Sequence, residues 1–504
     1  MMYLRTFEKW LVVSIFSTAT LVAVGPAARL ADAAEKMDRA SVRVLLQERV
    51  DVNEAQIDGM TALHWAAYQD DLETMKLLLD AGANIKVANR YGVTPLSLAC
   101  TNANETMVEL LLEAGADPNT ALRGGETVLM TSARTGRLGT VKALLSRGAD
   151  VNAKVGTGQT ALIWAVSEGY VEVVEELLKA GAEFLSPLVG SGFTPLLFAV
   201  RDGRSDVVQV LLKAGADVNE IVQRPDGSSP RLLPGPAGRA ARNGSSPLIL
   251  AVENGHFELA VQLLKAGADP NDQRSGLAPL HRIPNVRKPN RGDGGSPSPE
   301  GSGNLSSLEF VKALVAHGGD VSLRVKKAAS RRNFTRLGAT PFFLASVTAD
   351  VPLMRTLVEL GADPLLPNAE GCTPLLAASG IGVGDPGASP GTEPEVLEAL
   401  QLLLELGADI NKVDDNGETV MHGTAYKHLP KAVQFLADNG AKIEIWNQKN
   451  NNGWTPWLIA EGHRFGNFRP GPETMAAIGR AMNDSGVPPP TKRRARIKKI
   501  GYGN

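Results

Sequence analysis

Alanine-rich and leucine-rich stretches alternate along the chain, with polar turns between them. Ala66-Ala67 precedes Leu77-Leu78-Leu79, and the same order recurs along most of the sequence. The small side chains let one helix approach its neighbours closely, and the leucines pack a second helix on those beside it. Because a unit of two such helices cannot bury its own apolar face, units of this kind are expected to stack.

A threonine opens each predicted helix pair and shows the period. It stands at Thr61, Thr94, Thr127, Thr160 and Thr194, in steps of 33, 33, 33 and 34 residues, with later equivalents at Ser246, Ala278, Thr340, Thr373, Thr419 and Thr455. Its hydroxyl is expected to accept a hydrogen bond from the first turn of the helix. Gly82 and its equivalents are expected to end the second helix in a left-handed conformation.

A second motif recurs with the same period as the threonines. It reads AGANI at 81–85, AGADP at 114–118, AGADV at 214–218 and LGADI at 406–410. Together the two motifs resemble the ankyrin repeat, whose core is TPLH…A…LL…GAD-x-N, and Thr61-Ala62-Leu63-His64 is a close match. The resemblance covers residues 28–487. It implies an all-α solenoid of about 12 helix-turn-helix repeats with β-hairpin fingers.

The first and last segments of the repeat region are predicted to form terminal repeats. Residues 29–53 lack the TPLH and glycine signals, as expected for a repeat with one free face. Trp454-Thr455-Pro456-Trp457 opens a last repeat, whose second helix is expected at 473–482.

The first 27 residues have the order of a secretory signal peptide. Arg5 and Lys9 precede an uncharged apolar run at 10–24, and small residues follow. The run is shorter than the ~20 residues of a membrane span, although an uncleaved anchor is the alternative. Cleavage after Ala27 would keep the first predicted helix whole, whereas Ala33 has the better small-residue pattern. The expected location is periplasmic or secreted, with no membrane span after cleavage.

Four insertions interrupt the later repeats, at 220–243, 282–305, 322–337 and 380–394. The first and third lengthen a finger between two repeats, and the second and fourth separate the two helices of one repeat. Their Gly, Pro and Ser content predicts mobile loops. The two kinds are expected to project from different edges of the solenoid.

Positive charge gathers in these insertions, although the net charge of the chain is -2. Residues 322–337 contain no acid. They could attract an acidic patch on a partner, or they could be solvated loops without a ligand. A disordered basic tail is expected at 488–504. The cations of the first three insertions are Arg224, Arg231, Arg239, Arg242, Arg282, Arg287, Lys288, Arg291, Arg324, Lys326, Lys327, Arg331, Arg332 and Arg336.

Composition narrows the class of protein. The chain has 504 residues, more than one compact core usually holds, which suits growth by repetition. Its near-neutral charge does not favour nucleic acid or an anionic membrane. Cys100 and Cys372 lie seven repeats apart, roughly 70 Å at about 10 Å per helix layer, so a disulfide between them is excluded. Both thiols are expected to be buried.

No group of residues indicates catalysis, a cofactor or a metal. His64, His281 and His422 stand at the fourth position of the TPLH motif, where the resemblance implies a hydrogen bond within the repeat stack. The sequence has no nucleophile motif and no phosphate-binding loop. We therefore expect a protein that is not an enzyme and holds no cofactor and no metal.

The resemblance also implies where a partner binds, because finger tips and inner-helix ends line a concave groove in ankyrin folds. The mixture of aromatic, amide and charged residues there suits a protein interface. By register, the groove residues are Tyr68, Gln69, Tyr91, Asn102, Arg134, Glu168, Arg201, Asp202, Asn254, Tyr426 and Lys427, to which the basic insertion adds Arg324, Lys326, Lys327, Arg331 and Arg332.

The sequence therefore predicts a non-enzymatic scaffold for protein–protein interaction in an exported compartment. It resembles exported bacterial ankyrin-repeat proteins and is expected to be a monomer. Its partner is expected to be another protein with an acidic surface, and no nucleic acid is expected to bind. The alternative is a secreted effector, or the partner that neutralises one, which captures a target protein with the repeats.

Overall fold

The computed structural model describes residues 28–156, 158–224, 242–289, 298–299, 301–328, 334–387, 389–464, 466 and 469–490. Its helices fall into two compact units, unit 1 ending at Gly156 and unit 2 comprising the rest of the chain. The predicted signal peptide, residues 491–504 of the tail, Arg331 and Arg332 lie outside the described residues.

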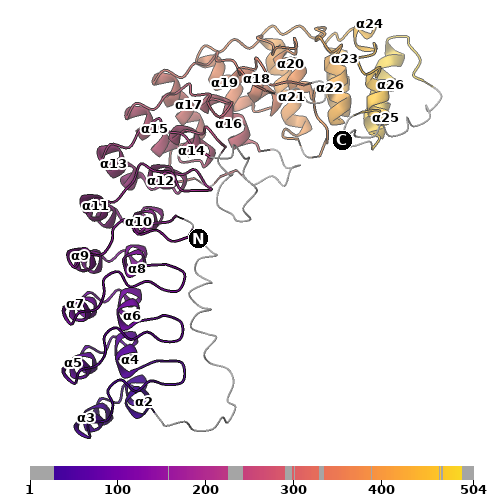
Figure 1. Ribbon diagram of the computed structural model, residues 1–504. Helices are drawn as coiled ribbons and strands as arrows, with labels where there is room; N and C mark the ends of the chain where they lie inside the picture. Colours follow the sequence, from indigo (N-terminus) through magenta and orange to yellow (C-terminus); the bar gives the residue numbers. More distant parts are fainter. Residues whose placement is uncertain are drawn as a thin grey trace. The chain divides into compact units, whose positions relative to one another are not determined.

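Unit 1 is built from stacked helix pairs. Figure 1 shows the first helices of the pairs in one row and the second helices in another, with α4 packed between α2 and α6. The pairs are α2 (Arg29–Glu35) and α3 (Arg39–Gln47), α4 (Ala62–Tyr68) and α5 (Leu72–Asp80), α6 (Pro95–Asn102) and α7 (Glu105–Glu113), and α8 (Val128–Thr135) and α9 (Leu138–Ser146).

Unit 2 repeats this design, and a single turn, α24 (Ile443–Trp446), precedes its last pair. The pairs are α10 (Ala161–Glu168) and α11 (Val171–Lys179), α12 (Pro195–Arg201) and α13 (Ser205–Lys213), α14 (Pro247–Glu253) and α15 (Phe257–Lys265), α16 (Pro279–Arg287) and α17 (Ser307–Ala316), α18 (Pro341–Val347) and α19 (Val351–Glu359), α20 (Pro374–Ser379) and α21 (Glu393–Glu405), α22 (Val420–Lys427) and α23 (Pro430–Asp438), and α25 (Pro456–Glu461) and α26 (Pro472–Asp484).

The predicted all-α class is confirmed. In the described parts of the chain the fingers between pairs contain no strand, and two of them carry an isolated bridge, Ala55 with Thr61 and Ala121 with Thr127. Both terminal repeats form helix pairs where the sequence predicts them. Cys100 and Cys372 are buried free thiols, as expected.

The helix-opening threonines act as predicted. Thr61, Thr94 and Thr127 accept hydrogen bonds from the third residue of their helices at 3.4, 3.2 and 3.3 Å. At the other end of the pair, Gly82 follows α5 with φ +83°, a conformation that glycine adopts without strain. Ser246 makes no such bond, so the capping rule does not extend to every repeat.

The TPLH histidines join each repeat to the next finger. Nδ1 of His64 accepts the Thr61 N–H at 3.2 Å, so the ring proton lies on Nε2, which donates to the Val93 carbonyl at 3.0 Å. His281 and His422 repeat this with the carbonyls of Leu323 and Trp454. Burial lowers the pKa of His281 and of His422 to about 4, which fits neutral, structural rings.

The insertions lie closer to the repeats than the sequence suggests. Helix α16 continues to Arg287, so the boundary expected at 282 moves beyond the helix. Asn304 donates its N–H to Glu258 at 2.7 Å, and His256 bonds the Ser302 hydroxyl at 2.8 Å. In the insertion at 380–394, which separates the two helices of another repeat, Thr392 is the N-cap residue of α21. Pro390 of that insertion accepts a hydrogen bond from Lys427 of the next repeat, so described residues of both insertions pack on neighbouring repeats.

A carboxamide shapes the finger tips. Oδ1 of Asn89 accepts the N–H groups of Tyr91 and Val93, both at 2.9 Å, and Asn368 and Asn450 do the same in later fingers. Asp414 takes this place in another finger, accepting from Asn416 at 2.9 Å and Glu418 at 2.8 Å. Burial raises the pKa of Asp414 to about 6, and its Oδ2 has no hydrogen-bond partner in the described structure.

We predict that Asp414→Asn stabilises the protein at pH 7 by about 1–3 kcal/mol, because it keeps Oδ1 and removes a buried charge. Since the folded pKa lies above the ordinary value, the ionised carboxylate costs stability only as the pH rises from 4 through 6. The gain in urea midpoint, followed by tryptophan fluorescence, should thus vanish at pH 4.

Asp409→Asn is the matched control, because that carboxylate is exposed and also accepts a backbone N–H. A gain for Asp414→Asn that is equal at pH 4 and pH 7 would show that charge burial is not its cause.

Candidate protein-binding surfaces

Unit 1 presents exposed aromatic and aliphatic side chains at its finger tips and inner helices. Tyr91 is 64% exposed and Tyr68 40%, and Tyr68 meets Trp65 edge-to-face with ring centroids 5.7 Å apart. Ile57, at the preceding finger tip, is 77% exposed and was missed in the sequence. Its place two residues before the finger glycine Gly59 could have revealed it. Rigid aromatic and apolar groups of this kind anchor protein interfaces.

Other predicted groove residues of unit 1 also serve the stack. The Asn102 amide donates to the carbonyls of Ala67 at 3.2 Å and Tyr68 at 2.9 Å, and Gln69 reaches the Glu35 carbonyl at 3.4 Å. Arg134 forms an ion pair with Glu126 at 3.6 Å. The Asn102 and Gln69 contacts join neighbouring repeats and the Arg134 pair lies within one repeat, so the presence of a polar residue at the groove position does not by itself indicate a partner.

The groove residues at the start of unit 2 are half-buried. Arg201 lies over the Phe198 ring at 4.9 Å and holds Asp202 with bonds of 2.8 and 2.9 Å. Asn254 donates to the Leu250 carbonyl of its own helix at 2.8 Å. Glu168 stands at the end of α10 and is half-buried.

Two residues at the end of α22 were predicted to line the exposed groove, and this prediction is wrong because both are buried. Tyr426 and Lys427 are only 5% and 4% exposed. The Tyr426 hydroxyl donates to Glu418 at 3.1 Å, and Asn450 bonds both groups. These side chains point into the repeat stack, and Pro390 and Arg464 contact this end of the helix. Lys427 donates to the Pro390 carbonyl, and Arg464 donates to the Tyr426 carbonyl.

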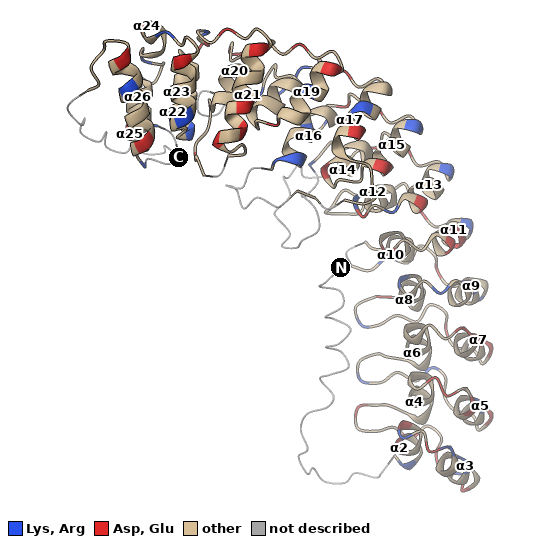
Figure 2. Ribbon diagram, turned by 180° about the vertical axis from the view of Figure 1, so that it is seen from behind, with Lys and Arg blue, Asp and Glu red and all other residues tan. Residues whose placement is uncertain are grey.

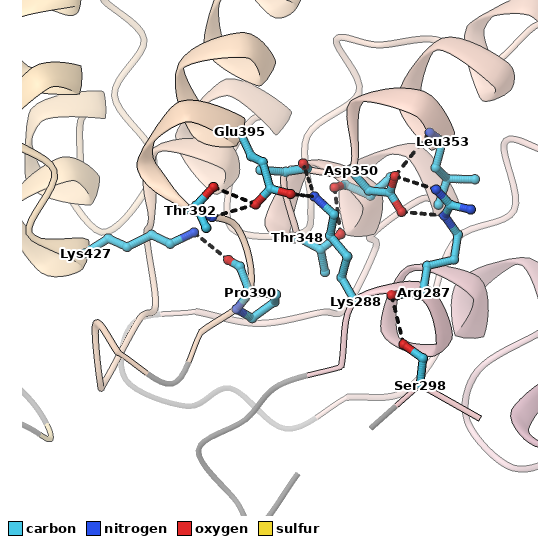
Figure 3. A network of polar contacts seen from close by, with 12 residues as sticks. Arg287, Lys288, Ser298, Thr348, Asp350, Leu353, Pro390, Thr392, Glu395 and Lys427 are labelled. Atoms are coloured by element: carbon cyan, nitrogen blue, oxygen red, sulfur yellow. Dashed lines mark hydrogen bonds and ion pairs between the residues drawn. The ribbon is translucent and has the colours of Figure 1, made fainter. Parts of the chain in front are cut away.

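Lys427 belongs to a network of charged groups shown in Figure 3. Its ammonium donates to the Pro390 carbonyl at 2.6 Å. Lys288 bonds the Ala349 carbonyl and Glu395, both at 2.8 Å, and Arg287 holds Asp350 at 2.6 and 3.0 Å. In Figure 2 the basic ends of α16 and α22 appear at the same edge of unit 2. Arg287 and Lys288 are therefore structural cations, not members of a free loop.

Burial shifts the pKa of Lys427, whereas hydrogen bonds and ion pairing set the pKa of Glu395. Loss of water contact, and then the like charge of Lys288, lowers the pKa of Lys427 to about 8. Glu395 has its pKa lowered to about 2, where the bonds from Lys288 and Thr392 outweigh partial burial. The sequence could not reveal these pairs, because their members lie up to 107 residues apart.

A second group of cations lies on the fingers of unit 2 and is exposed or half-buried. We call it the basic finger surface: Arg224, Arg242, Arg274, Arg324, Lys326, Lys327 and Arg336. Arg324, Lys326 and Lys327 stand where the sequence predicts, whereas Arg274, on a short finger between two long ones, was missed. Asp272 holds Arg274 at 2.9 Å.

Within the described residues, His, Cys, Asp and Glu form no group able to hold a metal ion. Among those same residues, no helix has the length and apolar character needed to cross a membrane.

Comparison with known proteins agrees with the stacked pairs. Models of ankyrin repeats match residues 30–122 and 129–221, and a single-repeat model matches 243–275. The chain contains ankyrin repeats. The finger tips of unit 1 with Ile57 and Tyr91, and Arg274 of the basic finger surface, lie within the matched residues, and ankyrin repeats are protein-interaction modules.

Three relatives share part of this chain. They are the putative ankyrin repeat protein L86 of Acanthamoeba polyphaga mimivirus (29% identical, 23% of this chain, 22% of the relative), the B-cell lymphoma 3 protein homolog of Mus musculus (30%, 30% and 29%) and the human 2-5A-dependent ribonuclease (31%, 27% and 14%). The chain thus spans less than a third of the length of each relative.

We predict that Lys427→Met is at least as stable as the native protein at pH 7, because an apolar chain of similar length replaces a buried cation. The folded pKa of Lys427 lies below its usual 10.5, so the native protein gains stability as the pH rises above 8. The advantage of the variant in urea midpoint should therefore shrink by about 1–2 kcal/mol between pH 7 and pH 9.5.

Lys412→Met, at an exposed finger lysine, is the control and should show no such pH dependence. A constant difference between Lys427→Met and the native protein would mean that Lys427 does not titrate in this range.

Proposed function

We propose that this protein is a non-enzymatic scaffold that binds another protein in an exported compartment and works as a monomer. The observation that carries the proposal is the pair of exposed surfaces on ankyrin fingers: the aromatic and apolar tips of unit 1, and the basic finger surface of unit 2. The first surface offers aromatic rings and the second offers arginines, and both kinds of side chain are enriched at protein interfaces.

The basic finger surface favours an acidic protein partner. Its seven cations lie on three consecutive fingers, while the whole chain is nearly neutral. Concentrated charge of one sign raises the rate of encounter with an oppositely charged surface and disfavours like-charged partners. Nucleic acid is not part of the proposal, because the outer helices carry many acids and the total charge gives no general attraction.

Site-specific crosslinking in cells of the source organism tests the scaffold. A photoreactive residue at Tyr91 or at Lys326 should capture one defined protein, whereas the same group at Lys76, on the exposed side of α5, should not. The captured protein, made separately, should then bind the full chain, and Tyr91→Ala or Lys326→Glu should weaken its binding about tenfold. Equal labelling from all three positions would argue against a specific interface.

Export is tested by the signal itself. Replacing Val12 and Val13 by arginine interrupts the apolar run and should leave the protein in the cytosolic fraction at its full length. Arg5→Lys, which keeps the positive charge, should be exported and shortened like the native chain. Recovery of the native protein in the cytosol, uncleaved, would remove the exported compartment from the proposal.

A further inference from the structure

Repeats in a solenoid are held mainly by the repeats beside them, and unit 1 shows this arrangement. At the turn between the two helices of a pair, Asn102 of α6 donates to the carbonyls of Ala67 and Tyr68 in the preceding pair. Asn104, which caps α7, donates to Asp70 of that same preceding pair at 3.1 Å. In a stack with only such contacts, one pair can open without disturbing pairs further away.

The insertion after α16 departs from this arrangement at its first end. Helix α16 itself packs on α14 and α18, its neighbours in the stack. Lys288, directly after α16, donates to the Ala349 carbonyl between α18 and α19 and to Glu395 in the first turn of α21, both at 2.8 Å (Figure 3). The bond to Glu395 therefore bypasses the α18–α19 pair and reaches the second pair along the stack.

The second end of the insertion reaches as far in the other direction. The Ser302 hydroxyl lies 2.8 Å from Nδ1 of His256, and Nε2 of that ring lies 3.0 Å from the Arg201 carbonyl at the end of α12. A Cβ atom on Gly203, in the turn between α12 and α13, would lie 3.0 Å from the same hydroxyl. Ser302 thus packs on the second pair before its own.

Backbone contacts hold this second end in place. Gly301 approaches the Gly255 carbonyl so closely that a Cβ atom at Gly301 would overlap it. The Asn304 N–H donates to Glu258 of α15 at 2.7 Å. The serine hydroxyl is therefore carried by a backbone that is itself docked on the α14–α15 pair.

The bonds at the first end are of the kinds that resist opening. Lys288 and Glu395 are 22% and 40% exposed, so water screens their attraction less than that of a fully exposed pair. Next to them, Arg287 holds Asp350, whose side chain is fully buried. Separation of α16 from α19 would leave that carboxylate buried without its cation, which is costly.

One insertion thus connects five consecutive pairs, from α12–α13 to α20–α21, at the turns between first and second helices. The fingers that carry the basic finger surface join the first four of these pairs, at the opposite ends of the first helices. Turns that cannot separate also keep those fingers at a fixed spacing. A partner would then lose less conformational entropy when it binds there.

We propose that the insertion after α16 is a brace, in which Lys288 at one end and Ser302 at the other make the five pairs from α12–α13 to α20–α21 open as one cooperative unit. Unit 1, whose turns contact the adjacent pair, opens pair by pair.

Hydrogen–deuterium exchange of the full chain at increasing urea concentrations, followed by mass spectrometry, tests the brace. In the native protein the most protected amides of α12, α16 and α20 should share one urea dependence, because they exchange through the same opening. In Lys288→Met, which keeps an unbranched side chain but loses the bond to Glu395, the amides of α20 and α21 should exchange about fivefold faster and follow a separate urea dependence.

Lys312→Met is the matched control, because Lys312 belongs to the same pair and forms an ion pair with Glu359 of the adjacent pair at 3.8 Å. Both of those side chains are more than half exposed, so the change in exchange should stay below about twofold and the common urea dependence should remain.

Glu395→Gln isolates the bond that bypasses a pair, because glutamine can still accept from the Thr392 N–H at the start of α21. It should also separate α20 and α21 from α16. In the double variant Lys288→Met/Glu395→Gln the exchange should be no faster than in Lys288→Met, as expected when both changes remove the same interaction.

The second end is tested by Ser302→Ala, which should raise the exchange of α12 about threefold. Its control is Ser298→Ala in the same insertion, because the Ser298 hydroxyl donates to the Arg287 carbonyl of its own pair at 3.2 Å. This control should leave α12 unchanged.

Separate urea dependences for α12, α16 and α20 in the native protein would overturn the brace, and so would equal effects of Lys288→Met and Lys312→Met. The measurement needs no partner, so it is independent of the proposed function. If crosslinking captures a protein while the brace variants behave like their controls, the brace alone is wrong. If the variants behave as expected and nothing is captured, the proposed function fails and the brace stands.

Discussion

Each helix pair of this protein has an apolar face that only the next pair can cover, and the remaining structure depends on that constraint. Leu63, Ala67 and Leu78 are almost fully buried because neighbouring pairs close over them. Stacking also brings the finger of one repeat to the first helix of another. The ring of His64 can therefore satisfy the Val93 carbonyl, and the Asn102 amide the carbonyl of Tyr68. Polar residues that resemble candidate binding or catalytic groups therefore serve to hold the stack together.

Function is consequently expected where the repeat does not need the residue. Ile57 and Tyr91 at the finger tips pack on little of the protein itself, and their exposure has a cost in water that a partner would remove. The basic finger surface differs in kind. Its arginines are anchored by backbone carbonyls and keep part of their donors at the surface, which is how a protein presents positive charge in a fixed geometry.

The irregular repeats of unit 2 replace part of the apolar packing with ion pairs. Arg282 and Glu253 pair at 3.0 Å while both are nearly buried, and Arg287 holds the fully buried Asp350. Buried pairs of this kind add little net stability, but removal of one partner is costly because the other charge remains without compensation. Such pairs can fix how α16 and the insertion after it align with the neighbouring repeats, since any other alignment would leave these charges unpaired. Lys427 differs from these pairs, because its ammonium donates to the uncharged Pro390 carbonyl and its replacement leaves no opposite charge unpaired.

The sequence by itself determined the period, the class of fold and the structural roles of the TPLH histidines, because these follow from local signals that recur every 33 or 34 residues in the regular repeats. The first terminal repeat follows from the loss of those signals at 29–53. It also located Tyr68, Tyr91 and the cations near 324–327, which follow from register alone. Only the tertiary structure decided that Tyr426 and Lys427 are buried, that Arg287 and Lys288 belong to a network, and that Arg274 joins Arg224 at one hollow. The physical reason is that these outcomes depend on how insertions fold back and which distant charges meet across repeats. No local pattern of the chain encodes such contacts.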